Sequence, residues 1–270
     1  MILPATAALL TALAGVPAVD SLTSTDTVLA GIVYTGNRGD DADTVYVCDE
    51  EEEEDLEPCE VEDMVRQAAS RGATLVVVSE AAFEMVPPEP APMIGTRPRG
   101  ASSKVLKRFA ALVDELDLYL VVQLEMHHED LLYSGQVAFD PRGITVGRHF
   151  KLELYDSEAE SYTAGTDFSV FDTPFGRVGM MICSDLYADP RLHHRLTREL
   201  GADIIALSSI WTVDDSTRWQ AAFAHDWQVT VIAANGAAGD GRGAGIYAPT
   251  GRPMTITHDG RDEVITAVLD

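Results

Sequence analysis

The stretch FDTPFGRVGMMICSDLYADP, residues 171–190, decides the fold and raises the question of function. Its apolar run at 176–183 is typical of a buried strand, and this strand delivers Cys183 directly into a polar turn that begins at Ser184. A free cysteine often acts only as a small buried hydrophobe, but a thiol at the end of a strand can also be a nucleophile. The segment alone does not separate these two readings.

Strands and helices alternate on both sides of this stretch. The predicted strands cover 26–36, 73–80, 118–126, 202–211 and 229–236, and the predicted helices cover 61–72, 102–117, 190–201 and 216–227. A hairpin is expected over 132–154 with its turn at 140–143, because Asp, Pro and Gly gather there. The pattern predicts an α/β fold whose sheets are covered by helices, with the chemistry at the carboxyl ends of the strands.

The composition limits the partners of the chain. With 270 residues and 46% hydrophobic content, the chain can bury a full core, and we expect a single domain over residues 26–270. The formal net charge of −25 repels phosphate backbones and anionic membrane surfaces, so nucleic acid is not an expected partner. After the amino-terminal segment, no apolar run reaches the length of a membrane span.

The amino terminus, MILPATAALLTALAGVPAVDS, resembles a secretory signal that would be removed after Ala18. We therefore expect residues 1–20 to be a signal peptide and the protein to be secreted or periplasmic. The segment lacks the positive residues of a typical signal. A buried first helix, an incorrectly assigned start and a cytoplasmic location are the alternatives.

Three reactive side chains stand where predicted strands end or turn, namely Glu80, Lys151 and Cys183. A nearby ammonium lowers the pKa of a thiol, and a carboxylate can accept the thiol proton as attack begins. Cys183 would then attack an amide or nitrile carbon, with Glu80 as general base and later general acid. Lys151 and the backbone N–H of Ser184 would stabilise the oxyanion. Each side chain alone also has an ordinary structural reading.

Five segments in order resemble the nitrilase superfamily of carbon–nitrogen hydrolases. They are GATLVVVSEAAFE (72–84), GRHFKLEL (147–154), the nucleophile segment at 171–190, GADIIALSSIW (201–211) and GAGIYAPTG (243–251). The resemblance implies a four-layer αββα sandwich and a triad of Glu80, Lys151 and Cys183. It also implies catalysis without a metal or organic cofactor, and association of copies through their helices.

Within the superfamily, the chain is most similar to the vanin and biotinidase branch, whose members are extracellular amidases. Three departures from that pattern concern the pocket more than the triad. Ser79 stands where proline is usual, Tyr133-Ser134 replaces a Tyr-Asn pair, and the histidine before the lysine is shifted to His149. We expect no counterpart of the further carboxy-terminal domain of that branch.

Four further residues receive weaker predictions. Glu160 resembles a second glutamate that orients the lysine in many family members, although neighbouring Glu158 fits the same alignment. Trp211 resembles an aromatic residue near the family's pocket, and a plain core tryptophan is an equal alternative. His193 and His194 lie in a predicted helix without spaced Cys or Asp partners, so we expect surface residues and not metal ligands.

Cys48 and Cys59 flank the acidic run DEEEEEDLEP. The odd count of three cysteines in an exported chain predicts one disulfide, between Cys48 and Cys59, and one free thiol at Cys183. The run lacks the spaced ligands and central glycine of an EF-hand, so a solvated acidic loop is the favoured reading.

The sequence therefore predicts a thiol amidase that hydrolyses a linear amide of a small molecule, with pantetheine-like or biotinyl amides as candidates. Transfer of the acyl group to an amine is one alternative. A non-catalytic binding protein that retains the fold is another. The identity of the amide and the oligomeric state remain open at this stage.

Overall fold

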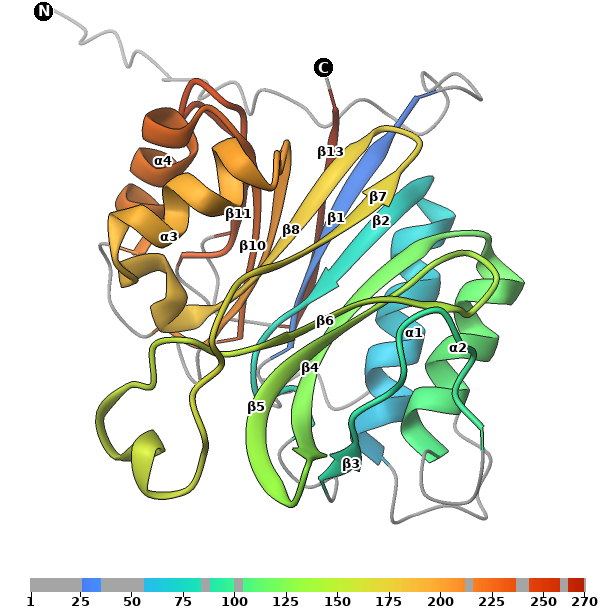
Figure 1. Cartoon of the computed structure of the whole chain (residues 1–270). Coiled ribbons are helices and arrows are strands. Elements are labelled where there is room, and N and C mark those ends of the chain that lie inside the picture. Colours follow the sequence, from blue (N-terminus) through green and yellow to red (C-terminus); the bar gives the residue numbers. More distant parts are fainter. Residues whose placement is uncertain are drawn as a thin grey trace, which may run out of the picture.

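The computed structural model describes residues 26–34, 56–83, 88–99, 104–211, 216–236, 243–257 and 262–269, except for the side chains of 56–59. The predicted signal peptide and the predicted disulfide partners, Cys48 and the side chain of Cys59, lie outside these residues. Two β-sheets face each other at the centre of the structure, and helices cover both outer faces (Figure 1). The helices are α1 (Leu56–Ser70), α2 (Lys104–Leu116), α3 (Pro190–His194) and α4 (Ser216–Trp227).

The first sheet lies under α1 and α2. Its described strands are β1 (Val28–Val33), β2 (Ala73–Val78), β3 (Glu89–Pro90), β4 (Tyr119–His128), β5 (Leu131–Phe139), β6 (Thr145–Phe150) and β13 (Glu263–Val268). They follow the order β13-β1-β2-β4-β5-β6, and β3 pairs with β4. Strands β1, β2 and β4 run parallel, whereas β13, β5 and β6 are each antiparallel to their neighbours.

The second sheet lies under α3 and α4. Its described strands are β7 (Ser169–Thr173), β8 (Gly176–Ile182), β9 (Ile204–Ser209), β10 (Thr230–Asn235), β11 (Gly245–Tyr247) and β12 (Pro253–Ile256). They follow the order β12-β11-β10-β9-β8-β7, with a parallel centre of β8, β9 and β10. The predicted αββα sandwich is confirmed.

Burial on both faces explains why the central strands are continuously apolar. Alternate residues of a strand point to opposite faces of the sheet. In β2, Val76 and Val78 pack beneath the helices, while Leu75 and Val77 pack against the second sheet. The sandwich therefore has three apolar layers, one between the sheets and one beneath each pair of helices.

The predicted hairpin is present as β5 and β6, which pair antiparallel. Its turn closes where Gly143 N donates to the Asp140 carbonyl at 2.8 Å. Gly143 has φ +69°, and a Cβ there would lie 2.2 Å from the Ala110 carbonyl oxygen. Both the backbone conformation and the close approach require glycine at this position. The hairpin carries Lys151 at its end.

The predicted helix at 190–201 is the clearest difference from expectation. It is divided into α3 and a following π-helical turn, η5 (Arg195–Glu199), in which Leu200 N donates to the Arg195 carbonyl at 2.8 Å. A span of five residues between donor and acceptor is the π-helical pattern, which sequence periodicity does not reveal.

Candidate active site

Four strand ends meet at one end of the two sheets. Glu80 follows β2, Lys151 follows β6, Cys183 follows β8 and Trp211 follows β9. Hydrogen bonds hold the two sheets together here, since Glu80 N donates to the Ser209 carbonyl at 3.3 Å. The structure thus brings together the three reactive residues that the sequence singled out.

Lys151 lies between two carboxylates. Its Nζ donates to Glu80 Oε1 at 2.8 Å and to Glu158 Oε1 at 2.6 Å, and its side chain is 1% exposed. Burial by itself lowers the pKa of Lys151. The negative charge of Glu80, together with both hydrogen bonds, outweighs burial and raises this pKa above its ordinary value of 10.5. Lys151 therefore remains an ammonium group at neutral pH.

Glu80 is buried, and its two carboxyl oxygens have different surroundings. Oε1 accepts the hydrogen bond from Lys151, while Oε2 has no hydrogen-bond partner of normal geometry among the described residues. Burial raises the pKa of Glu80 above its ordinary value of 4.5, against the opposing effect of the Lys151 charge. A raised pKa makes this carboxylate a stronger base than an exposed glutamate.

Cys183 sits in a sharp turn from strand to helix. It follows β8 directly and begins η4 (Cys183–Tyr187), and its φ of +45° is a left-handed conformation that non-glycine residues rarely adopt. Trp211 Nε1 donates to Cys183 Sγ at 2.7 Å, and the backbone of Ile210 provides a further hydrogen bond. This turn directs the thiol toward Glu80 and Lys151.

The protonation state of Cys183 depends on burial and on two charged neighbours. Burial and the negative charge of Glu80 raise the pKa of the thiol above its ordinary value of 9.0, and the opposing effect of Lys151 is smaller. Lys151 acts in the expected direction, and the raised pKa leaves the Cys183 thiol neutral at neutral pH. The thiolate therefore has to form as the proton leaves for Glu80.

Asp185 anchors the turn to the lysine segment. Its buried Oδ1 accepts hydrogen bonds from Leu152 N at 2.7 Å and Glu153 N at 3.0 Å, directly after Lys151. Its Oδ2 accepts from Ile182 N at 2.9 Å, directly before the nucleophile. One carboxylate therefore fixes the spacing between the lysine and the thiol.

Two histidines support the same anchor, and one of them was placed wrongly by the sequence. His149 Nε2 donates to Asp185 Oδ2 at 2.8 Å, and both side chains are fully buried. His193 was expected on the surface, but it is buried and its Nε2 donates to the Asp185 carbonyl at 2.8 Å. His193 lies on the inward face of α3, where its ring packs beside the ring of Phe168. A lone histidine in a short helix gives no sequence signal for such a contact.

We expect Asp185→Asn to lower kcat with little change in KM. The asparagine amide would point an N–H group at Ile182 N or at Leu152 N, leaving a buried donor unsatisfied and allowing Lys151 and the thiol to separate. A misplacement of about 1 Å at a reacting centre costs on the order of a hundredfold in rate. Steady-state kinetics measures this effect. The matched control is Asp189→Asn in the next turn, which should leave kcat unchanged because this residue caps α3 and pairs with Arg191 at the surface.

Glu158, and not Glu160, contacts the lysine. Both belong to the 3₁₀ helix η3 (Asp156–Glu160), and two residues correspond to about two thirds of a 3₁₀ turn, so their side chains point to different sides. Glu158 faces Lys151, whereas Glu160 is exposed. Of the two glutamates that the sequence left open, Glu158 is therefore the one that the structure places against Lys151.

The remaining predicted residues lie close to the thiol. Trp211 is 8% exposed and contacts Sγ, so it is both a core residue and part of the site. Ser184 follows the nucleophile, and its Oγ donates to the Glu153 carbonyl. This bond fixes the peptide whose N–H was predicted to face the oxyanion. At Ser79, where proline was expected, the hydroxyl accepts from Tyr34 N at 3.1 Å and so joins β1 to the end of β2.

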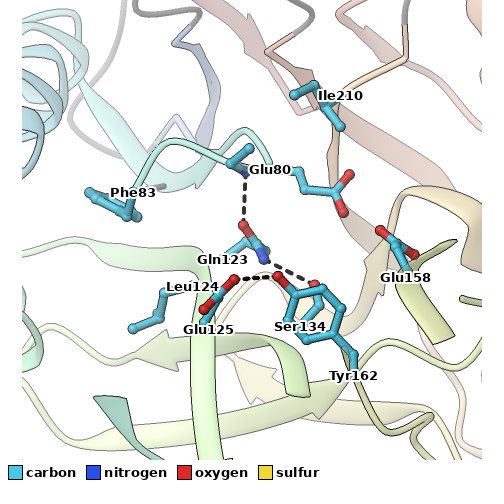
Figure 2. A pocket seen from close by; sticks show the side chains of 10 residues that line it. Glu80, Phe83, Gln123, Leu124, Glu125, Ser134, Glu158, Tyr162 and Ile210 are labelled. Atoms are coloured by element: carbon cyan, nitrogen blue, oxygen red, sulfur yellow. Dashed lines mark hydrogen bonds between the residues drawn. The ribbon is translucent and has the colours of Figure 1, made fainter. Parts of the chain in front are cut away.

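A pocket of about 490 Å³ opens beside Glu80 and Glu158. Figure 2 shows Gln123 at its centre, with Glu125 and Tyr162 on the side away from the Glu80 carboxylate. Gln123 Oε1 accepts from Ala81 N at 2.9 Å, and its Nε2 donates to Ser134 Oγ at 3.0 Å. Of the three reactive residues, Glu80 is the one that lines this pocket.

Within the described part of the chain, no cluster of three or more His, Cys, Asp or Glu side chains has the arrangement of a metal site. In the same residues, no helix is both long enough and apolar enough to cross a membrane.

Comparison with known proteins identifies relatives over most of this chain. The family model described as carbon-nitrogen hydrolase matches residues 59–270. Biotinidase of Rattus norvegicus is 39% identical over 109 residues, which cover 38% of this chain and 20% of that protein. An omega-amidase of Xenopus laevis is 30% identical over 134 residues, which cover 46% of this chain and 47% of the relative. The chain spans less than two thirds of the length of the curated relatives it matches.

Solved structures show the same fold. The structure of an amidase from Nesterenkonia sp. superposes with a TM-score of 0.71 and 16% sequence identity, over 92% of both chains. This likeness concerns the arrangement of the layers.

Proposed function

The chain belongs to the carbon-nitrogen hydrolase family of the nitrilase superfamily, and on this basis we propose that it is a thiol amidase using Glu80, Lys151 and Cys183. The observation that supports this proposal most strongly is the convergence of the three side chains. They come from separate strand ends, and Lys151 Nζ lies 2.8 Å from the Glu80 carboxylate. The reaction is hydrolysis of a linear amide of a small molecule.

The first half-reaction forms an acyl-enzyme. Cys183 Sγ attacks the amide carbon while Glu80 Oε2, the oxygen without a described partner, accepts the thiol proton. The carbonyl oxygen becomes an oxyanion next to the Lys151 ammonium and the Ser184 N–H. When the intermediate collapses, Glu80 returns the proton to the departing amine, and a thioester remains on Cys183.

The second half-reaction releases the acid. Water attacks the thioester carbon as Glu80 removes one of its protons, and the same two donors stabilise the second oxyanion. Collapse breaks the carbon–sulfur bond, and the proton on Glu80 returns to the sulfur. No metal or organic cofactor takes part in this scheme.

The test is a panel of pantetheine, biotinyl amides and simple aliphatic amides, with release of amine or ammonia as the readout. Intact mass measurement after rapid quenching should show a thioester on Cys183 with any amide that is cleaved. Absence of both product and adduct with every amide would argue against the proposal.

Two alternatives can be separated from hydrolysis. Acyl transfer would use the same thioester, and the presence of a competing amine would then divert the acyl group from water. A non-catalytic binding protein would bind small molecules at the pocket without forming an adduct. All three reactive residues are present. Lys151 is hydrogen-bonded to Glu80, and Cys183 lies beside Glu80, and this arrangement favours catalysis over binding alone.

We expect the reactivity of Cys183 to follow the ionisation of Glu80. The pKa of Glu80 is raised above 4.5 by burial, so alkylation by iodoacetamide and kcat/KM should both fall as the pH drops through that raised value. Because the pKa of the thiol lies above 9.0, the rate should show no inflection where ordinary thiols ionise. Glutathione in the same buffers is the control. A single inflection near pH 8.5, the ordinary thiol value, would contradict the scheme.

A further inference from the structure

The pocket beside the triad carries an excess of negative charge. Three of its lining residues are carboxylic acids, Glu80, Glu125 and Glu158, and no described lining residue is Lys, Arg or His. The nearest ammonium group, that of Lys151, is buried behind the wall and already bonds to Glu80 and Glu158. A ligand in this pocket therefore faces carboxylates, and no described lining residue offers it a positive charge.

Glu125 is the carboxylate that the catalytic scheme does not use. It lies on β4, and Tyr162 OH donates to its Oε1. No described Lys, Arg or His pairs with Glu125, and no described residue donates to its Oε2. Burial and the bond to Glu125 raise the pKa of Tyr162 above its ordinary value, so the phenol stays a donor. The phenol thus holds Glu125 in place through one oxygen and leaves the other without a described donor.

The amide of Gln123 and the hydroxyl of Ser134 in the wall already form hydrogen bonds within the protein. Both ends of the Gln123 amide are bonded, to Ala81 N and to Ser134 Oγ, as the dashed lines in Figure 2 show. Phe83 and Leu124 add apolar surface. Apart from Glu80 Oε2, which the catalytic scheme uses as the base, the wall therefore offers a hydrocarbon surface with a Glu125 oxygen that has no described donor, a combination that suits an alkyl chain ending in a cation.

We propose that this pocket selects amides whose non-reacting end carries a positive charge, such as an alkylammonium group, and that Glu125 binds this charge. The inference rests on the proposed amidase function and names its substrate class. An anionic end would face like charges, which is unfavourable in a partly buried site, and a neutral end would leave Glu125 unused. Neutral pantetheine is then a poor substrate.

The test uses three amides of similar length and shape that differ in the terminal group. They are 5-aminopentanamide, hexanamide and adipic acid monoamide, which are cationic, neutral and anionic. We expect the wild-type kcat/KM to fall in that order. Hexanamide or the anionic amide cleaved as well as the cationic one would overturn the inference while leaving the amidase function intact.

Variants identify the residue responsible. Glu125→Gln should lower kcat/KM for 5-aminopentanamide about tenfold or more, the effect of losing a hydrogen bond to a charged group, and should leave hexanamide almost unchanged. Tyr162→Phe should weaken the same preference by releasing Glu125. The control is Glu160→Gln, an exposed glutamate that does not line the pocket, which should have no effect on either amide. Equal losses for both amides in Glu125→Gln would refute the assignment.

A binding readout separates this inference from the proposed function. Pentylammonium should protect Cys183 from iodoacetamide at lower concentration than 1-pentanol does, and Glu125→Gln should abolish the difference. If no amide is cleaved but this selective protection is found, the pocket inference stands and the amidase proposal fails. Equal protection by both compounds overturns the pocket inference whatever the activity.

Discussion

Cys183→Ala is expected to abolish amide hydrolysis and leave the fold intact. The replacement removes only the sulfur from a buried turn, and alanine adds no atom that could clash. Trp211 and Lys151 stay in place as donors, to the position of the thiol and to the carboxylates, and neither supplies the thiol that the covalent bond requires. Removing a catalytic nucleophile costs on the order of 10⁴- to 10⁶-fold in kcat.

The measurement is amine release at saturating substrate, together with circular dichroism and thermal unfolding. Cys183→Ser is a second test of the nucleophile, since its hydroxyl fits the same turn but ionises far less readily than a thiol. Both variants should also lose the thioester adduct. An alanine variant with more than trace turnover would show that the chemistry does not pass through Cys183.

Lys151→Met is expected to lose both activity and stability. The ammonium is the described positive partner of two carboxylates, and removal of one member of a buried ion pair costs about 3–5 kcal/mol. Loss of one oxyanion donor separately costs on the order of 10²- to 10³-fold in kcat. The thiol should also alkylate more slowly at neutral pH, because the charge of Lys151 lowers the pKa of Cys183.

The pH dependence of the free energy of unfolding shows whether lost ion pairs or a packing defect destabilises Lys151→Met. In the variant the pKa of Glu80, already raised by burial, rises further once the lysine charge is gone. A carboxyl whose folded pKa exceeds its unfolded value binds more protons when folded, so stability should increase as the pH falls toward 4.5. Denaturant unfolding between neutral and mildly acidic pH measures the trend.

The double variant Lys151→Met/Glu158→Gln is the matched control. It removes one of the two stranded carboxylates, so it should recover part of the lost stability and none of the lost activity. If the single and double variants are equally stable at neutral pH, the ion pairs do not explain the loss.

The sequence predicted the layers well because buried strands leave a strong local signal. The run ATLVVV of β2 is apolar on both faces, and only a strand covered on both sides has that pattern. Glu80, Lys151 and Cys183 were also visible, since each stands where such a strand ends. Their mutual contact is a consequence of strand order, which the resemblance supplied and local pattern could not.

What the sequence missed depends on side-chain direction and on distant partners. Glu158 and Glu160 are both acidic, and only the path of a 3₁₀ turn decides which one faces Lys151. His193 is buried because a carbonyl eight residues earlier needs a donor. The pairing of Glu125 with Tyr162 joins positions 37 residues apart across a pocket, and no periodicity connects them.

The pairing of β13 with β1 has a consequence for how the protein is made. Val28 lies opposite Val268, so β1 meets β13 only after the residues between these two strands, 34–262, have been synthesised. Closing so long a loop has a high entropic cost, and contacts distant in sequence form late in folding. Until then one edge of β1 stays open to pairing with other chains. The first sheet is therefore the slower half of the sandwich to complete, and its open edge is the point at which a nascent chain is most exposed to aggregation.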